Sequence, residues 1–226
     1  MPVTCFLIEQ TDRVQLSLRR YRQGTRWDAE IGASVTTENG RCPLPHGYHN
    51  AATVIGEAPV LYQVHEDGHK TYARRPEEDA IGRDDPRWPA TCACGEPFNA
   101  DDAWQVFSDH IYRRVDNGEE RQLRDWQKVP GAMWDAWYYH DWARMCGFDG
   151  RSMCVVCPDG HEWCIDGVAS NCPIPEDRGH KCWLRTGEPP NLTVGKNVEG
   201  QRTCSAGGGS IATPGYHGFM TSGVFT

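Results

Sequence analysis

The sequence has few aliphatic residues and no long apolar run. Hydrophobic residues make up 38% of its 226 positions, whereas it contains 24 glycines and 15 prolines. Such a composition disfavours long helices and a large aliphatic core. No segment approaches the roughly 18 consecutive apolar residues of a membrane span, and the first residues lack the basic region and apolar run of a signal peptide. We therefore expect synthesis and folding in a cytoplasm, with no secretion by a signal peptide and no membrane partner.

Positive charge is also in short supply. The formal net charge is −8, which argues against a general polyanion binder because phosphate contacts need clustered lysine and arginine. The one basic cluster consists of Arg13, Arg19, Arg20, Arg22 and Arg26. We interpret it as a solvated face or as ion-pair donors to an acidic protein, with a nucleic-acid site as the alternative.

Motifs that would identify a reaction are missing. His161-Glu162 has no second histidine to complete the H-E-x-x-H of a metalloprotease, and the glycines at 207–209 are not followed by the Lys-Ser/Thr of a phosphate-binding loop. An enzymatic function is therefore less favoured than a structural one. The alternative is a zinc-dependent enzyme in which Glu162 or Asp166 lies near a metal with an open coordination position.

Cysteine and tryptophan are abundant by contrast, with eleven and nine residues. In a reducing compartment, a large number of cysteines indicates metal ligands or free buried thiols more strongly than it indicates disulfides. Tryptophan side chains can fill space between loops where leucine and isoleucine are scarce. Metal ligands and large aromatic side chains are thus expected to take over part of the role of an aliphatic core.

A hairpin with a ligand-bearing turn is predicted around residues 154–165. The residues on both sides of Pro158-Asp159-Gly160 favour strands, and these three residues favour a tight turn. Cys157 and His161 flank the turn, so their side chains can converge on one point. A turn that carries two such ligands is how a zinc ribbon begins.

A second ligand-bearing turn is predicted at Cys92-Ala93-Cys94-Gly95, where Gly95 can adopt the left-handed conformation that lets backbone amides face a sulfur. Zinc prefers four tetrahedral sulfur or nitrogen donors, which two such turns supply together. The sequence therefore predicts a structural zinc site with four ligands: Cys92, Cys94, Cys157 and His161. In an alternative set Cys154 replaces His161, although strand alternation would point Cys154 and Cys157 to opposite faces.

Two further groups of cysteine and histidine can bind a metal. One group consists of Cys172, His180, Cys182 and Cys204. It can form a second metal site or a disulfide cluster, and the alternatives to a metal are a Cys172–Cys182 disulfide or buried thiols. Prolines in the connecting loop lower the entropy cost of gathering these donors. The second group is Cys42, His46 and His49, which has less support because the neighbouring prolines fix an extended backbone and no fourth ligand is obvious nearby.

The predicted fold class is β-rich α+β, with short antiparallel hairpins, zinc-ribbon-like turns, one short Trp-rich helix and much irregular loop. Asp116-Asn117-Gly118 is a strong hairpin signal. Tryptophans at helical spacing predict the helix over Met133–Met145, with a core-facing stripe or, as the alternative, an exposed docking face. The acidic stretch 77–86 indicates a linker between an irregular N-terminal region with short strands, residues 1–87, and a Cys/His-rich domain stapled by metal or disulfides, residues 88–226.

Four motifs carry a resemblance to a known family: Trp88-Pro-Ala-Thr-Cys92-Ala-Cys94-Gly95, Gly131-Ala-Met-Trp134-Asp-Ala-Trp137, Cys157-Pro-Asp-Gly-His161-Glu-Trp163 and Tyr216-His-Gly-Phe219. They resemble a family of uncharacterised Cys/His/Trp-rich proteins encoded by tailed bacteriophages and prophages, over most of the chain and more strongly after Trp88. The family brings no established catalytic residues. Cys146, Cys154 and Cys164 lie outside its pattern, and disulfides within or between subunits of a mature particle would use such positions.

The resemblance implies synthesis in the cytoplasm of a bacterial host and incorporation into a virion. We therefore expect a non-enzymatic structural or interaction protein, a head, neck or tail accessory of a tailed phage, stabilised by a structural zinc site. Its expected partners are other virion proteins and further copies of the same chain. The alternatives are the zinc-dependent enzyme and, with less support, a nucleic-acid-binding phage accessory protein.

Overall fold

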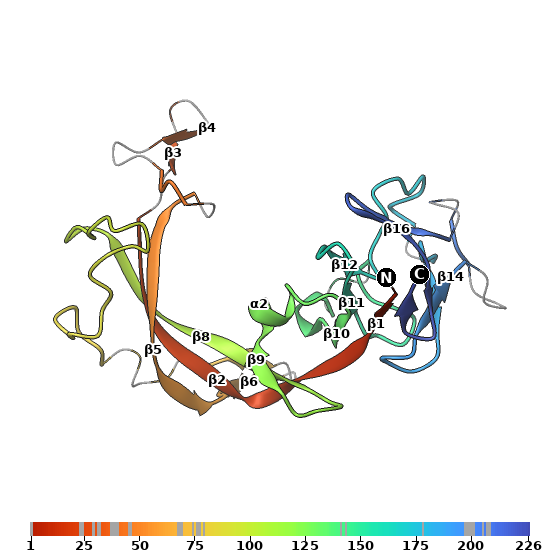
Figure 1. The fold of residues 1–226 in the computed structure, drawn as a ribbon, viewed down its shortest axis with the longest axis horizontal. Helices are drawn as coiled ribbons and strands as arrows, with labels where there is room; N and C mark the ends of the chain where they lie inside the picture. Colours follow the sequence, from red (N-terminus) through yellow and green to blue (C-terminus); the bar gives the residue numbers. More distant parts are fainter. Residues whose placement is uncertain are drawn as a thin grey trace. The chain divides into compact units, whose positions relative to one another are not determined.

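The chain folds into two compact units (Figure 1). The first unit comprises Met1–Thr11 and Ile111–Thr226, and the second comprises Asp12–His110. The computed structural model describes residues 2–22, 25–28, 30, 33–36, 41–44, 47–66, 70–73, 75, 78, 80–140, 142, 144–177, 179–196, 202–204, 206 and 209–226. His46, Gly207 and Gly208, and residues 77 and 79 of the expected linker, lie outside them.

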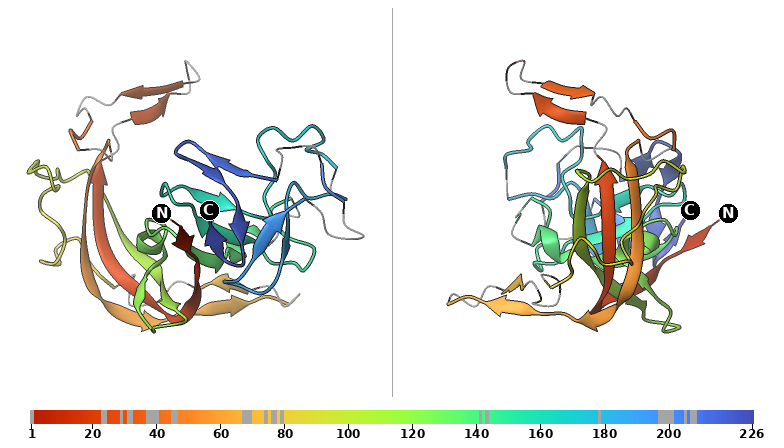
Figure 2. Two further views of the ribbon diagram at one scale, coloured as in Figure 1. Left: turned by 45° about the vertical axis from the view of Figure 1, so that its right-hand side comes forward. Right: turned by 90° about the vertical axis from the view of Figure 1, so that its left-hand side faces the viewer.

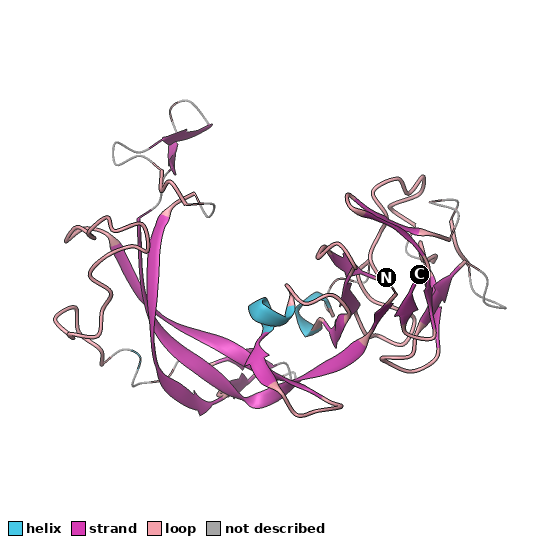
Figure 3. Cartoon of the chain, in the orientation of Figure 1, coloured by secondary structure: helices cyan, strands magenta, loops and turns pink. Residues whose placement is uncertain are grey.

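Strands make up most of the regular structure (Figure 3). Two long strands contribute residues to both units: β2 (Phe6–Arg22) and β8 (Ala103–Arg114). The other elements of the second unit are β3 (Thr25–Asp28), β4 (Ala33–Thr36), β5 (His49–Pro59), β6 (Tyr62–Val64) and β7 (Lys70–Tyr72). Those of the first unit are β1 (Val3–Thr4), β9 (Glu120–Gln122), α2 (Leu123–Trp126), β10 (Ala132–Asp135), the 3-10 helix η1 (Trp137–Tyr139), β11 (Met153–Val156), β12 (Glu162–Cys164), β13 (Leu184–Thr186), β14 (Thr193–Gly195), β15 (Ile211–Thr213), β16 (Tyr216–Gly218), β17 (Met220–Thr221) and β18 (Val224–Phe225).

These elements confirm the predicted β-rich α+β fold with short antiparallel hairpins and a short helix. The helix, however, is α2, and the position predicted for it over Met133–Met145 is wrong. There, Trp134 lies in β10, paired with Cys154 of β11, and is fully buried. Trp137 and Trp142 are 42% and 62% exposed. Strand pairing at one end of the segment thus overrides the helical spacing of its tryptophans, because spacing alone carries no information about a partner strand.

The core of the first unit is built on both faces of β11. This strand pairs antiparallel with β10 and with β12, and β10 pairs in parallel with the start of β2. Met153, Val155 and Cys157 pack in one hydrophobic cluster, whereas Cys154 and Val156 pack in another. A strand covered on both faces is uniformly apolar, which explains the run of buried residues in β11.

The remainder of the first unit consists of short hairpins and loops. β13 pairs with β14, β15 with β16 and β17 with β18, and β18 also pairs with β1. The described residues between β12 and β13 contain turns and one isolated bridge, Lys181 to Thr203, but no helix or strand. Main-chain hydrogen bonds by themselves would therefore hold the segment between β12 and β13 only weakly.

The second unit is organised on the pairing of β2 with β5, which runs from Arg13↔Pro59 to Arg22↔His49 (Figure 2). Leu18 of β2 is fully buried and packs with Trp88 and Val106. Because β2 and β8 pass from one unit to the other, these units do not follow the linear boundary that we placed at residue 87.

The arginines of β2 are engaged by neighbouring residues. Arg13 pairs with Glu57, Arg19 with Asp109, and Arg22 with Asp102 and Glu96. Arg20 donates to the backbone carbonyls of Pro89 and Asn99. These contacts agree with the ion-pair interpretation of the cluster, while the side chain of Arg26 lies outside the described part. None of the described helices is long and apolar enough to cross a membrane.

Candidate metal centres

Among the described residues, the structure brings together two groups of four side chains that could hold a metal ion. Within each group, one donor atom from every residue lies within 4.8 Å of the other three. We call the group in the second unit site A; it consists of Cys42, His49, Cys92 and Cys94. We call the group in the first unit site B; it consists of Cys172, His180, Cys182 and Cys204.

Site A joins the start of β5 to a tight turn. His49 is the first residue of β5, whereas Cys92 and Cys94 lie on the turn that follows the core residue Trp88. The turn is closed by hydrogen bonds from the amide of Gly95 to the carbonyl of Cys92, 2.9 Å, and from the amide of Cys92 to the carbonyl of Glu96, 2.8 Å. Gly95 has φ +92°, so it adopts the predicted left-handed conformation.

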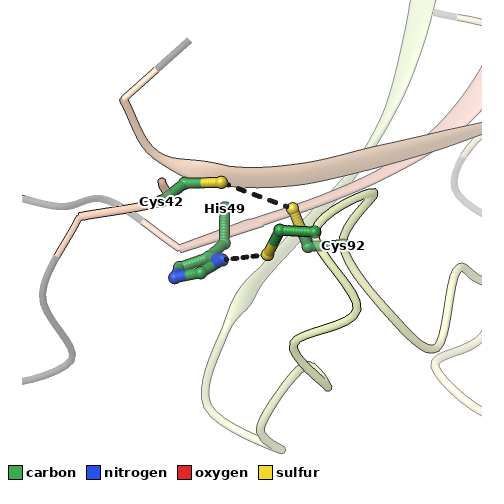
Figure 4. A group of neighbouring side chains, drawn as sticks. Cys42, His49 and Cys92 are labelled. Carbon is green, nitrogen blue, oxygen red and sulfur yellow. Dashed lines mark hydrogen bonds between the residues drawn. The ribbon is translucent and has the colours of Figure 1, made fainter. Parts of the chain in front are cut away.

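The donor spacing of site A matches a tetrahedral metal site. The Sγ atoms of Cys42 and Cys92 are 3.9 Å apart, and Sγ of Cys94 is 3.3 Å from Nδ1 of His49 (Figure 4). Tetrahedral zinc places its sulfur ligands about 3.8 Å from one another and a sulfur about 3.6 Å from a nitrogen. A disulfide would instead require about 2.05 Å between the sulfurs.

The surroundings of site A favour a thiolate at Cys92. Burial works against the charged form, but hydrogen bonds from the amides of Cys94 and Asn50 and from the side chains of His49 and Cys94 outweigh it and lower the pKa of Cys92 to about 6. The Cys42 thiol behaves differently, because burial raises its pKa. Binding of a divalent cation is therefore expected to release the proton of Cys42, as zinc coordinates thiolates.

Site B is assembled from loops around the β13–β14 hairpin. Cys172 and His180 lie in the segment between β12 and β13, and Cys182 lies just before β13. Cys204 follows β14 in sequence. The backbone bridge between Lys181 and Thr203, with a 3.0 Å hydrogen bond from the amide of Lys181 to the carbonyl of Arg202, brings Cys204 beside Cys182.

The four donors of site B lie at the corners of a compact tetrahedron. Sγ of Cys204 is 3.8 Å from Sγ of Cys172 and 3.6 Å from Sγ of Cys182. Nε2 of His180 is 3.4 Å from Sγ of Cys172 and 4.0 Å from Sγ of Cys182. These separations are again those of zinc with three sulfurs and one nitrogen. All eleven cysteines are free thiols, so the Cys172–Cys182 disulfide that the sequence left open does not form here.

Backbone amides and one lysine surround the sulfurs of site B. The amide of Ala169 donates to Sγ of Cys182 at 3.3 Å, and the amide of Ala206 donates to Sγ of Cys204 at 3.5 Å. The Lys196 ammonium donates to the carbonyls of Cys182 and Ala206 and lies 3.5 Å from the carbonyl of Cys204. Against the effect of burial, the Ala206 amide, the neighbouring thiols and the Lys196 charge lower the pKa of Cys204.

Replacement of Lys196 by methionine is expected to weaken the affinity of site B for an added divalent metal ion, tested with Zn²⁺, by about tenfold or more, because partners that orient metal ligands typically contribute 10- to 100-fold to affinity. Competition with a chromophoric zinc chelator measures this change, with site A as the internal reference. Lys128→Met is the matched control, since Lys128 is exposed and paired with Asp125. Equal affinities in the two variants would show that Lys196 does not position the ligands.

Site A replaces the ligand set that the sequence suggested for Cys92 and Cys94. Cys157 is fully buried in a hydrophobic cluster, where burial raises its pKa to about 12. His161 is exposed on its turn, and its Nδ1 lies 3.0 Å from the carboxylate of Asp159. Cys154 packs in the other cluster, on the face of β11 opposite to Cys157, so the set with Cys154 is not assembled either. The hairpin was predicted correctly, but its cysteine points into the core.

The partners that the sequence analysis did not combine with Cys92 and Cys94 are Cys42 and His49. The sequence analysis grouped Cys42 and His49 with His46 and found no fourth donor nearby, and the Cys92–Cys94 turn lacked two donors; these incomplete sets were the available signal that one could complete the other. The pairs are about fifty residues apart, and the pairing of β2 with β5 brings His49 to the end of β2 at Arg22. Arg22 in turn contacts Glu96 and the carbonyl of Pro97, directly after the cysteine turn.

The carboxylates considered for a catalytic zinc are held by other groups. Glu162 accepts a hydrogen bond from Nε2 of Gln127 at 2.8 Å. Asp166 accepts from the amide of Met153 at 2.8 Å and from Nε of Arg185 at 3.1 Å. Both side chains thus have structural roles in the first unit.

Comparisons with protein-family models, with curated proteins and with solved structures return no match for this chain. The phage resemblance remains a prediction from the motifs alone. The chemistry of sites A and B is therefore the main basis for a functional conclusion.

Proposed function

We propose that this chain is a non-enzymatic structural protein in which each unit is held together by one zinc ion, and that it serves as an accessory component of a tailed-phage virion. The observation that carries the zinc proposal is that each site presents three cysteines and one histidine with tetrahedral spacing. Thiolate and imidazole ligands suit Zn²⁺ better than the oxygen-preferring Mg²⁺ or Ca²⁺.

Four protein ligands support a structural rather than a catalytic zinc. Catalytic zinc sites keep three protein ligands and leave one position for water or substrate, whereas structural sites are closed by four. In site A, the closed set joins the cysteine turn to the start of β5. In site B, it ties the irregular segment after β12 to the residues beyond β14.

The stabilising role follows from the local structure around each site. The described residues between β12 and β13 form no regular element, and nothing but short hairpins flanks them. A chain with 38% hydrophobic residues offers little aliphatic packing to hold such segments. A bound zinc ion supplies the missing cross-links among them.

The virion assignment is supported by the motif resemblance and by the character of the surface. The first unit exposes large aromatic side chains, among them Trp137, Trp142 and Phe148. Aromatic residues are enriched in protein–protein interfaces, and a net charge of −8 disfavours direct contact with packaged nucleic acid. Other virion proteins and further copies of this chain are the partners that we propose, after synthesis in the host cytoplasm.

Metal analysis of the purified protein tests the zinc proposal. Protein prepared under reducing conditions is expected to carry two zinc ions per chain, one for each site. Cys42→Ser and Cys204→Ser are each expected to retain a single zinc ion, because each removes one ligand of one site. Elemental analysis by mass spectrometry, combined with thiol titration, gives both numbers.

Two control variants separate this assignment from the earlier one. Cys157→Ala and His161→Ala remove residues that the sequence suggested as ligands and that belong to neither site A nor site B. Both are expected to retain two zinc ions. A metal-free protein with all of its cysteines titratable would contradict the zinc proposal, and loss of one zinc ion from Cys157→Ala would contradict the ligand assignment.

The virion proposal has its own test. Particles produced by the phage or prophage that encodes the chain are banded on a density gradient and digested for mass spectrometry. Peptides of this protein are expected in the particle band in a constant ratio to the major capsid protein. Recovery of the protein only from the soluble lysate would exclude a virion component.

A further inference from the structure

Five cysteines lie outside sites A and B, and two of them face each other across a strand pair. Cys154 of β11 and Cys164 of β12 are register partners in the antiparallel hairpin. Cys5, Cys146 and Cys157 complete the five and occupy buried positions.

The hydrogen bonds of the hairpin define what kind of pair this is. The amide of Cys157 donates to the carbonyl of His161, and the amide of Ile165 donates to the carbonyl of Met153, each at 2.8 Å. Hydrogen-bonded and non-hydrogen-bonded pairs alternate along an antiparallel ladder, so Cys154 and Cys164 form a non-hydrogen-bonded pair. In such pairs the Cα atoms are about 4.5 Å apart and the side chains approach closely, within the range that a disulfide requires.

As register partners, Cys154 and Cys164 project from the same face of the hairpin. Both side chains belong to the same hydrophobic cluster. Cys154 is fully buried, whereas Cys164 is partly exposed. The pair therefore has one thiol that a reagent can reach and a second directly behind it.

We propose that Cys154 and Cys164 are a redox-active dithiol that a low-molecular-weight disulfide, of the glutathione type, converts into a cross-strand disulfide joining β11 to β12. This proposal is independent of the zinc sites, since neither cysteine belongs to them. It gives a role to cysteines that the metal centres leave unused.

The reaction is a pair of thiol–disulfide exchanges. The Cys164 thiolate attacks one sulfur of the small disulfide, forms a mixed disulfide and releases the first small thiolate. Cys154 then loses its proton, attacks Sγ of Cys164 and releases the second small thiolate. Two protons from the cysteines convert the leaving groups to thiols, so the protein loses two electrons and the small disulfide gains them.

The environment assigns the order of the two steps. Hydrogen bonds from the Cys154 thiol and then from Ser152 and the Asp166 backbone lower the pKa of Cys164 despite its burial. The pKa of Cys154 is raised, first by its hydrogen bond to Cys164 and second by its burial. The more exposed member of the pair is thus also the one whose lowered pKa favours the thiolate, which is the attacking form.

The other cysteines outside the metal sites lack these features. Burial raises the pKa values of Cys5 and Cys157 to about 12, so both stay protonated. The thiol of Cys146 is directed at backbone carbonyls, 3.2 Å from that of Tyr139 and 3.4 Å from that of His140. These three cysteines are expected to remain thiols under conditions that oxidise the pair.

The test uses the full chain with its metal retained. The protein is exposed to glutathione disulfide, quenched in acid, alkylated and digested with trypsin. Cleavage after Arg151 and Arg178 yields one peptide that contains Cys154, Cys157, Cys164 and Cys172. The expected result is the loss of two alkylation sites from this peptide, which fragmentation assigns to Cys154 and Cys164, with no change in zinc content.

Variants identify the two steps. Cys164→Ser is expected to abolish the cross-link and glutathione addition at this hairpin, whereas Cys154→Ser accumulates one glutathione on Cys164. Cys146→Ser should oxidise like the wild type. Circular dichroism confirms that each variant folds like the wild type. Full alkylation of Cys154 and Cys164 after oxidation, or a cross-link of either to another cysteine, would overturn the proposal.

Discussion

Removal of the two zinc ions that we propose is expected to destabilise the protein by about 10 kcal/mol or more for each site, the order of magnitude that structural zinc contributes in small domains. When both sites are empty, the combined loss exceeds the net stability that a domain usually has, about 5–15 kcal/mol. Treatment with a strong chelator under reducing conditions should therefore unfold the segments that the ligands join. Circular dichroism during the chelator titration measures the transition.

Hydrogen exchange locates the effect within each unit. Amides of residues 168–177 and 179–183, around site B, and of residues 91–97, around site A, are expected to lose protection first, because these segments lie outside the named strands and depend on the ligands to hold them together. The buried strands β10 and β11 should exchange last.

Re-addition of zinc is the control for this experiment. Protection should return with two equivalents of zinc and should not return with magnesium, which does not suit sulfur ligands. Identical exchange with and without metal would mean that packing alone holds these segments and would rule out a structural role for zinc.

The Asp102→Ala variant is expected to lose about 3–5 kcal/mol of stability, since the buried Arg22 charge then loses its buried partner, and the remaining carboxylate, Glu96, is exposed and 3.5 Å away. Only 5% of the Asp102 side chain and 6% of the Arg22 side chain are exposed. The Asp102 carboxylate accepts hydrogen bonds from Nε and a terminal nitrogen of Arg22, both at 2.8 Å, and from the amide of Asn99 at 2.7 Å. Urea denaturation followed by tryptophan fluorescence measures the change.

Two further variants make this prediction specific. Asp125→Ala removes the exposed partner of Lys128 and should change stability far less. The double variant Arg22→Met, Asp102→Leu removes both buried charges and is expected to recover much of the loss, because no charge is then left unpaired. If the Asp102 and Asp125 variants are equally stable, the Arg22–Asp102 pair is not a main support of the second unit.

The same pair predicts how stability depends on pH. Burial raises the pKa of Asp102, but the hydrogen bonds from Arg22 and Asn99 outweigh this effect and keep the pKa below its ordinary value. A carboxylate with a lowered folded pKa contributes its stability above the unfolded value, about 3.9 for aspartate. The contribution is lost as the pH falls through the lower folded value, so wild type and Asp102→Ala should converge in stability in strong acid.

Local sequence was sufficient to identify several turns. Pro158-Asp159-Gly160, Asp116-Asn117-Gly118 and Cys94-Gly95 all contain a glycine with positive φ in the structure, as their turn chemistry predicts. The members of site B could also be named from the sequence, because they cluster within a short stretch that has few other elements. The structure brings the same four residues together.

The ligands of site A required long-range pairing that no local pattern contains. The register of β2 with β5 places His49 opposite Arg22, and Arg22 holds the segment after the cysteine turn through Glu96 and Pro97. Likewise, the tryptophans between residues 133 and 145 have helical spacing, but β11 offers Trp134 a strand partner and a buried position.

Composition and turn chemistry by themselves determined that this protein is β-rich, poor in aliphatic core and rich in turns that carry cysteine and histidine, because these properties depend on residue type and near neighbours. Only the tertiary structure decided which cysteines meet. The direction of a side chain from a strand, inward for Cys157 and toward Cys164 for Cys154, depends on strand register and on what covers each face. Those are contacts between segments far apart in the chain, and spacing along the sequence does not encode them.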